Sequence, residues 1–182
     1  MNNVFNEIYK LQIALRDISL KDWAPNELFK WNWWVGISVF IIPIIVCWIL
    51  IDKKRILDIV LFGCLVSLIT NFLDIVGHDY GLWDYPILLL PNIHHFIEVD
   101  SSALPVAYML IYQYFPSWKK FIIANIIMAA ISAFIIEPLF VFMKLYEKPG
   151  WKYIYSFPIY IILAILCRFL MNKMKKIHLS NM

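Results

Sequence analysis

The segment Ile56–Val76, with the sequence ILDIVLFGCLVSLITNFLDIV, has two properties that decide the fold. It is mostly apolar and about twenty residues long, which is the length that a helix needs to cross ~30 Å of hydrocarbon. Spacings of three or four residues also place a stripe of small and polar residues on one face of this helix: Gly63, Ser67, Asn71, Asp74 and His78. Amide and carboxylate groups without partners are costly in lipid. We therefore expect the stripe to face the interior of a helix bundle or a wet cavity.

The rest of the chain is similarly apolar. Of its 182 residues, 62% are hydrophobic and 16% are charged, and the mean hydropathy is +0.71, whereas a soluble domain is nearer half apolar and a quarter charged. Five segments have the composition of membrane spans: 31–51, 56–76, 93–115, 121–143 and 158–174. The third is long enough only if its helix begins near Ile93, with Asn92 as the N-cap. We predict an all-α polytopic membrane helix bundle, with a five-helix domain over 31–176 and a short C-terminal tail, 177–182.

The N-terminal segment, 1–30, is a different kind of element. Its apolar residues recur at spacings of three and four, which is one face of an α-helix: Val4, Ile8, Leu11, Leu15 and Ile18. This pattern predicts an amphipathic helix that lies in the membrane interface or covers one end of the bundle.

Basic residues set the expected orientation. With five spans, three basic groups fall on one side of the membrane: Lys53, Lys54 and Arg55, then Lys119 and Lys120, then Lys173, Lys175 and Lys176. Basic loops are typically cytoplasmic, so we expect a cytoplasmic C-terminus and an outer N-terminus. Three lysines on the opposite side count against this orientation: Lys144, Lys148 and Lys152.

Three acids are predicted to meet in the outer leaflet. At ~1.5 Å per helical residue, Asp74 lies ~27 Å above the cytoplasmic end of its span, and Glu137 and Asp100 lie ~24 Å above the ends of theirs. We therefore expect a polar pocket between the second, third and fourth spans. Its acid–base residues would be Asp74, Glu137 and Asp100, with His78 as a relay or ligand.

Other residues surround the expected pocket. We predict that four of them contact a substrate: Asn71, Trp83, Asp84 and Tyr155. Pro105 and Pro138 each remove a backbone hydrogen bond within about a turn of an acid. Irregular backbone at membrane depth is tolerated where it is buried in protein or lines a cavity.

Several functions fit this cluster. In an acid–base enzyme, burial and mutual repulsion would push the carboxyl pKa values apart, and a lipid or isoprenoid dissolved in the bilayer could enter sideways. A zinc site, which takes nitrogen and oxygen ligands, would draw on His78, His94, His95 and Glu98, with Asp74. No HExxH motif is present, and no other cofactor is expected. A transporter, sensor or assembly subunit could instead bind a proton or cation there, and in a purely structural bundle the acids would only pair with neighbours.

The expected partners are membrane lipids. The net charge of +3 is small and spread along the chain. The sequence has no Gly-rich phosphate loop, zinc-finger spacing or aromatic RNA-binding motif. Nucleic acid is therefore not an expected partner.

Short segments of the chain resemble a known family. GLWDYP (Gly81–Pro86), IEP (Ile136–Pro138), Tyr146–Trp151 and YSFP (Tyr155–Pro158) look like segments of a family of small, uncharacterised multi-pass membrane proteins from spore-forming Gram-positive bacteria. The resemblance covers most of the chain beyond the N-terminal helix. It implies a bacterial plasma-membrane location and brings no activity. Integral-membrane prenyl cyclases of the lycopene type are similar in style only, and because their carboxylate motifs are not matched, no catalytic residue carries over.

Overall fold

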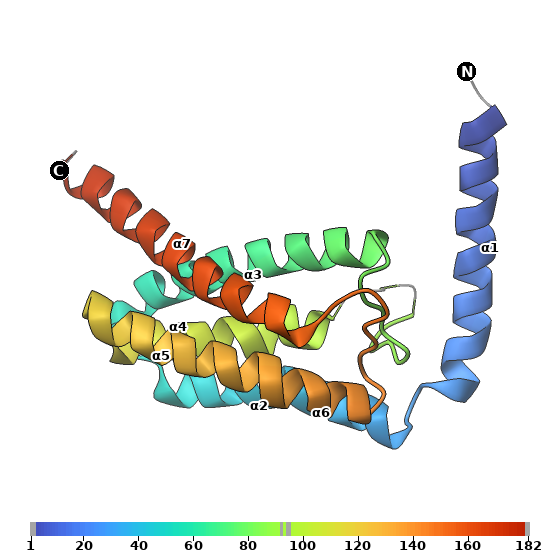
Figure 1. The fold of residues 1–182 in the computed structure, drawn as a ribbon, viewed down its shortest axis with the longest axis horizontal. Coiled ribbons are helices and arrows are strands. Elements are labelled where there is room, and N and C mark those ends of the chain that lie inside the picture. The colour runs from blue at the N-terminus through green and yellow to red at the C-terminus, as the bar shows by residue number, and fades with distance from the viewer. Residues whose placement is uncertain (1–2, 92, 94–95, 181–182) are drawn as a thin grey trace.

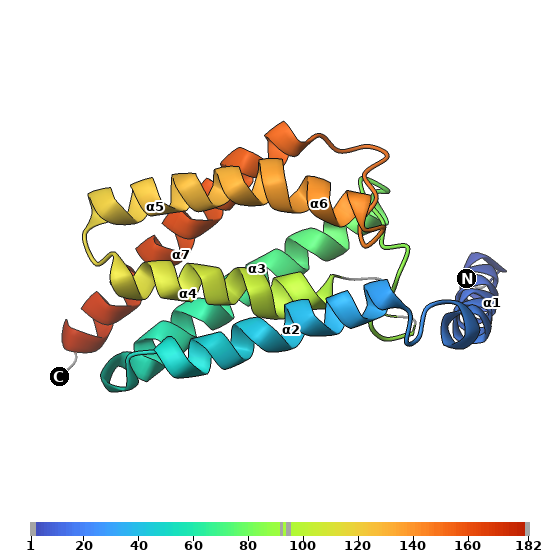
Figure 2. The same ribbon diagram turned by 90° about the horizontal axis from the view of Figure 1, so that it is seen from below.

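The computed structural model describes residues 3–91, 93 and 96–180, and within these ranges every regular element is a helix. Five helical segments run back and forth along one axis (Figures 1 and 2): α2 (Trp31–Leu50), α3 (Ile56–Asp79), η2–α4 (Val99–Ala103 and Leu104–Tyr114), α5–η3–α6 (Trp118–Ile131, Ser132–Ile136 and Glu137–Phe142) and α7 (Tyr153–Ser180). The short turn η1 (Lys53–Arg55) joins α2 to α3. The predicted all-α helix bundle is confirmed.

Four of these segments are long and apolar enough to cross a membrane: Trp31–Leu50, Lys53–Asp79, Trp118–Phe142 and Tyr153–Ser180. The last is longer than predicted, because the helix begins before Pro158 and continues through most of the expected C-terminal tail. The protein is therefore a multi-pass membrane protein by the length and composition of its helices.

The third predicted span is shorter than expected. Its η2 part has 5 residues, its α4 part has 11, and residues 97 and 98 before them are also helical, so at ~1.5 Å per residue it is roughly 27 Å long. Ile93 is not helical, which makes the predicted start wrong, and the predicted N-cap Asn92 lies outside the described residues. The physical reason is a long-range contact: the Phe96 N–H donates to Asp74 Oδ2 at 3.1 Å, and the Phe96 carbonyl accepts from the first helical N–H groups.

Helix α4 lies at the centre of the bundle, between α2 and α5 in Figure 2. Its aromatic residues build the core, where Tyr112 stacks on Phe62 with ring centroids 4.3 Å apart. Phe121 of α5 packs edge-on against the same Phe62 ring. Tyr108, fully buried, donates its hydroxyl to the Tyr160 carbonyl of α7 at 2.6 Å. These contacts fix the position of the helix that carries Asp100.

Two π-helical turns interrupt the helices directly before Pro105 and Pro138, where irregular backbone was expected. The Leu104 N–H donates to the Val99 carbonyl five residues back, and the Glu137 N–H donates to the Ser132 carbonyl in the same way. Pro105 and Pro138 follow directly and have no N–H to continue the pattern. The expected irregular backbone is therefore present, and each turn presents an acid to the bundle interior.

Helix α1 (Asn3–Asn26) extends crosswise to the bundle (Figure 1). Every residue of its apolar stripe is exposed, from Val4 to Ile18. Contact with the bundle begins at its C-terminal end, where Trp23 Nε1 donates to the Leu88 carbonyl at 2.8 Å and the Glu27 carboxylate accepts from the Leu88 N–H. The helix thus does not cover the bundle, and its direction fits a position in the membrane plane.

The two ends of the bundle differ in charge. In both views the α2–α3 turn, the α4–α5 turn and the C-terminal part of α7 lie at one end, and the loops that follow α3 and α6 lie at the other. The three predicted basic groups therefore share an end. There Lys175 pairs with Asp58 at 2.6 Å, and Arg168 donates to the carbonyls of Phe115 and Pro116 at the end of α4.

Candidate functional site

A cavity of about 720 Å³ lies towards the loop end of the bundle. Its walls come from α2, α3, η2–α4, η3–α6 and α7. Side chains of the loops that follow α3 and α6 also line it: Trp83, Tyr85, Phe96, Tyr146 and Trp151. Most of the wall is apolar. The site is therefore an apolar cavity with a few acids, and the expected polar pocket is not supported as a description of its surface.

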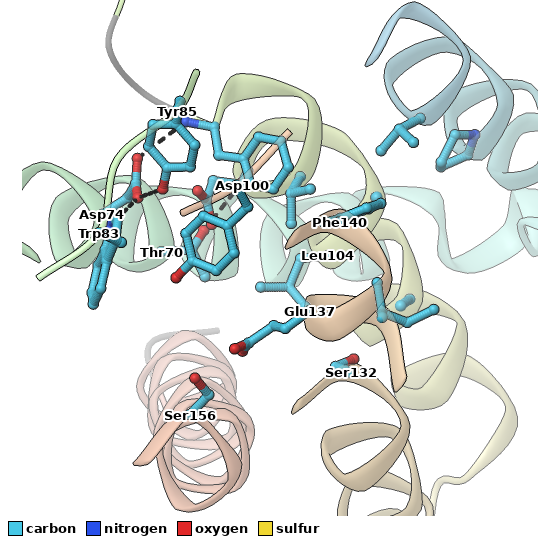
Figure 3. Close-up of a pocket in the computed structure, with 18 of the residues that line it drawn as sticks. Thr70, Asp74, Trp83, Tyr85, Asp100, Leu104, Ser132, Glu137, Phe140 and Ser156 are labelled. Atoms are coloured by element: carbon cyan, nitrogen blue, oxygen red, sulfur yellow. Dashed lines mark hydrogen bonds between the residues drawn. The ribbon is translucent and has the colours of Figure 1, made fainter. Parts of the chain in front are cut away.

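Asp74 anchors the loop that follows α3 at one end of the cavity. Its Oδ1 accepts from the Trp83 indole N–H at 2.8 Å and from the Tyr85 hydroxyl, while Oδ2 accepts from the Phe96 N–H. Gly77, one turn further along α3, leaves the space that the Trp83 ring occupies, since a side chain there would overlap the ring. Figure 3 shows Asp74 among these side chains. Burial and the Asp74 charge raise the pKa of Tyr85 well above its usual value, so the hydroxyl keeps its proton and donates.

Glu137 anchors the loop that follows α6. Its Oε2 pairs with the Lys148 ammonium, and its Oε1 accepts from the Tyr160 hydroxyl at 2.8 Å. Both charged side chains are buried, with 8% of Glu137 and 6% of Lys148 exposed. Burial lowers the pKa of Lys148, although its hydrogen bond and ion pair with Glu137 oppose this effect. The Glu137 side chain extends into the cavity towards Ser156 of α7 (Figure 3).

Asp100 is the third acid on the cavity wall. Because the π-helical turn continues into Pro105, the Asp100 carbonyl lacks its helical donor, and α3 replaces it: Thr70 Oγ1 and Asn71 Nδ2 donate at 3.1 and 3.2 Å. The carboxylate differs from those of Asp74 and Glu137. Among the described residues, no group donates a hydrogen bond to it. The structure thus brings the three predicted acids to one cavity. Of these three, only the Asp100 carboxylate accepts no hydrogen bond from the described residues.

Several residues predicted for the site lie beside the cavity. His78 stacks near Tyr85 with ring centroids 6.3 Å apart, and its Nε2 lies 3.3 Å from Asp84 Oδ1. Asn71 braces η2 through Asp100 and Ser101. Tyr155 is half-exposed and packs on Trp151. Of the four residues predicted to contact a substrate, only Trp83 lines the cavity.

A zinc site finds little geometric support. Among the described residues, no group of three or more His, Cys, Asp or Glu side chains is arranged to hold a metal. His94 and His95 lie outside the described residues. Glu98 is buried against α2, where a Cβ at Gly36 would lie 3.0 Å from its Oε1, so the glycine lets the carboxylate approach that helix.

The loop that follows α3 and the loop that follows α6 contact each other directly. Asp84 and Glu147 exchange both backbone hydrogen bonds at 2.9 Å, and the Gly150 N–H donates to the Leu82 carbonyl. Trp83 packs edge-on against Trp151 with ring centroids 5.2 Å apart. Asp74 and Glu137 therefore fix two loops that act as one cover.

Sequence reasoning missed the residues that satisfy the acids. Tyr85 is not among the site residues predicted from the sequence, yet only 6% of it is exposed. Lys148 was considered only for the orientation, and Tyr160 is likewise absent from the predicted site. The available signal was chemical: a buried carboxylate needs donors, and the loop after Glu137 carries lysines, among them Lys148.

Comparison of the chain with protein-family models, curated proteins and solved structures gives no match. The function must therefore be argued from the cavity and its acids.

The two kinds of acid predict different effects on stability. Asp74→Asn removes the charge from a three-donor site and turns an amide N–H₂ towards a donor. We expect a loss on the order of 1.5–3 kcal/mol in the free energy of unfolding, measured by denaturant titration in detergent micelles. Asp100→Asn should change it far less, and exposed Asp84→Asn serves as the charge control. Equal losses for Asp74→Asn and Asp100→Asn would contradict this division.

Proposed function

We propose that the protein is a membrane-embedded acid–base enzyme that acts on a lipid or isoprenoid dissolved in the bilayer. A cavity of about 720 Å³ falls within the ~300–1,000 Å³ typical of small-molecule sites. Its apolar walls suit a hydrocarbon chain, and its few acids lie where one end of such a molecule would stop. The observation that carries the proposal is the Asp100 carboxylate, which lines this apolar cavity with no donor from the described residues.

The proposal gives the acids different roles. Asp100 is the proton-transfer group, because no described hydrogen bond holds its carboxylate. Glu137 is a positioning residue that, with Tyr160 and Lys148, holds the loop after α6 over the cavity. Asp74 is a positioning residue that fixes the loop cover.

A membrane-dissolved substrate would enter from the side. The loops cover the outer end, whereas cavity residues on α2 are open to the surroundings, with Trp31 62% and Trp34 52% exposed. Ile136 of η3 lies on the opposite wall and is also exposed. In a bilayer, exposed apolar side chains on a spanning helix face lipid, which supports lateral entry along α2.

The proposed location is the bacterial plasma membrane, with the cavity in the outer leaflet. The basic end of the bundle is then cytoplasmic by the positive-inside rule. The Glu137 ion pair strengthens this orientation, because it neutralises Lys148, one of the three lysines at the opposite end. Lys144 and Lys152 remain exposed there.

The alternative is a non-enzymatic component, such as a transporter, sensor or assembly subunit, that binds a proton or cation in the same cavity. The observation that favours it is that Asp74 and Glu137 already have strong partners, which leaves a single acid for chemistry. Both functions use Asp100. They differ in whether a bound molecule is changed.

Lipid mass spectrometry separates the two functions. Wild-type protein in liposomes made from lipids of cells that express it, incubated in D₂O, should yield a lipid species of new mass or with carbon-bound deuterium. Asp100→Asn should yield none, and Asp84→Asn, which alters an exposed carboxylate, should match the wild type. A lipid that co-purifies with the wild type but never changes would contradict the enzyme and favour the binding component.

The orientation has a direct test in right-side-out membrane vesicles. In a background without Cys47, Cys64 and Cys167, a cysteine replacing exposed Tyr80 should react with a membrane-impermeant thiol reagent. A cysteine replacing Lys119 should react only after permeabilisation. The reverse pattern would place the cavity in the cytoplasmic leaflet.

A further inference from the structure

We infer that the cavity takes a long-chain amine, whose ammonium group pairs with the Asp100 carboxylate while its hydrocarbon chain lies along the apolar wall. This inference rests on the proposed function and names its substrate class. It follows from the sign of the charges in the cavity and from the way the chain satisfies its other two acids.

The cavity selects against anions. Among the described residues that line it, three are acids, Asp74, Asp100 and Glu137, and none is Lys, Arg or His. Lys148 reaches Glu137 from the loop and neutralises that acid alone. A carboxylate or phosphate head group placed here would be buried beside like charges, which is unfavourable in a low-dielectric site.

The Glu137 site shows how this chain binds an ammonium group. The Lys148 ammonium pairs with the carboxylate and lies 3.8 Å from the centre of the Tyr153 ring and 5.6 Å from that of Tyr146. Carboxylate and aromatic faces together are the usual surroundings of a desolvated organic cation. Tyr146 also lines the cavity that Asp100 faces.

Asp100 has the same kind of surroundings as the Lys148 ammonium site, a carboxylate beside aromatic rings, but no cation. Its carboxylate has no donor among the described residues, and the aromatic rings of Tyr85, Phe96 and Tyr146 line the same region of the cavity. These rings pack on one another, with Phe96 5.0 Å from Tyr85 and 5.9 Å from Tyr146 between centroids. An ammonium group from a ligand would supply the missing donors and the missing charge.

The apolar wall accounts for the rest of the ligand. The cavity wall also includes Ala103 of η2 and Leu104 and Ala107 of α4, which have small or aliphatic side chains. Ile159 and Leu163 of α7 line it as well. A saturated chain fits this surface, and the exposed α2 side gives it a route from the bilayer.

Three matched ligands test the inference on the full-length protein in nonionic micelles. Dodecylamine, dodecanol and dodecyl phosphate share one chain and differ in head group, and binding is followed by tryptophan fluorescence, because Trp31, Trp34, Trp83 and Trp151 line the cavity. We expect saturable binding of dodecylamine that is at least about tenfold tighter than that of dodecyl phosphate, as a charge-assisted hydrogen bond of ~1.5–3 kcal/mol implies. Dodecyl phosphate binding as tightly as the amine would overturn the inference, and this comparison needs no variant.

Two variants locate the binding. Asp100→Asn should weaken dodecylamine binding at least about tenfold and leave dodecanol binding little changed, whereas Asp84→Asn should leave both unchanged. Amine binding that survives Asp100→Asn would overturn the inference. If the protein changes a lipid but does not prefer the amine, the long-chain amine is ruled out and the proposed enzyme stands. If it prefers the amine but changes no lipid, the proposed enzyme is ruled out and the amine site stands.

Discussion

A carboxylate buried in a membrane protein needs hydrogen-bond donors, because leaving it without them is costly. The donors that Asp74 binds determine how the loop after α3 folds over the bundle. The two Asp74 oxygens gather an indole, a phenol and a backbone N–H from residues that lie 9, 11 and 22 positions further along the chain. The same contact delays the start of the third helix to Phe96 and beyond, and so sets the position of Asp100.

Glu137 repeats this arrangement with different chemistry. Asp74 accepts from the neutral groups of Trp83, Tyr85 and Phe96, whereas Glu137 pairs with a buried lysine and a tyrosine. The loops that they hold are joined by the Asp84–Glu147 backbone pair and by the packing of Trp83 on Trp151. Two acids thus serve to cover the cavity, and the π-helical turn before Pro105 presents the third, Asp100, to its interior.

The sequence predicts features that depend on one helix or on the thickness of the bilayer. Hydropathy locates the long spans. The free-energy cost of exposing amides and acids to lipid correctly predicts that Asp74 faces the bundle interior. Depth counting places the three acids at one level. Contacts between distant segments were not predictable: the third helix begins late because Phe96 meets Asp74, and Lys148 is a structural partner because the second loop folds back. His78 shares the periodicity of Asp74, yet spacing alone could not show that Asp74 lines the cavity while His78 lies against Asp84.

The central claim is that Asp100, unlike Asp74 and Glu137, is open to an apolar molecule that arrives from the bilayer. Dicyclohexylcarbodiimide tests it directly, since this apolar reagent partitions into membranes and attaches covalently to carboxyl groups that it can reach. Peptide mass spectrometry of the treated protein should find the adduct on Asp100 and leave Asp74, Glu98 and Glu137 unmodified. An adduct on Asp74 or Glu137 with Asp100 untouched would contradict the account.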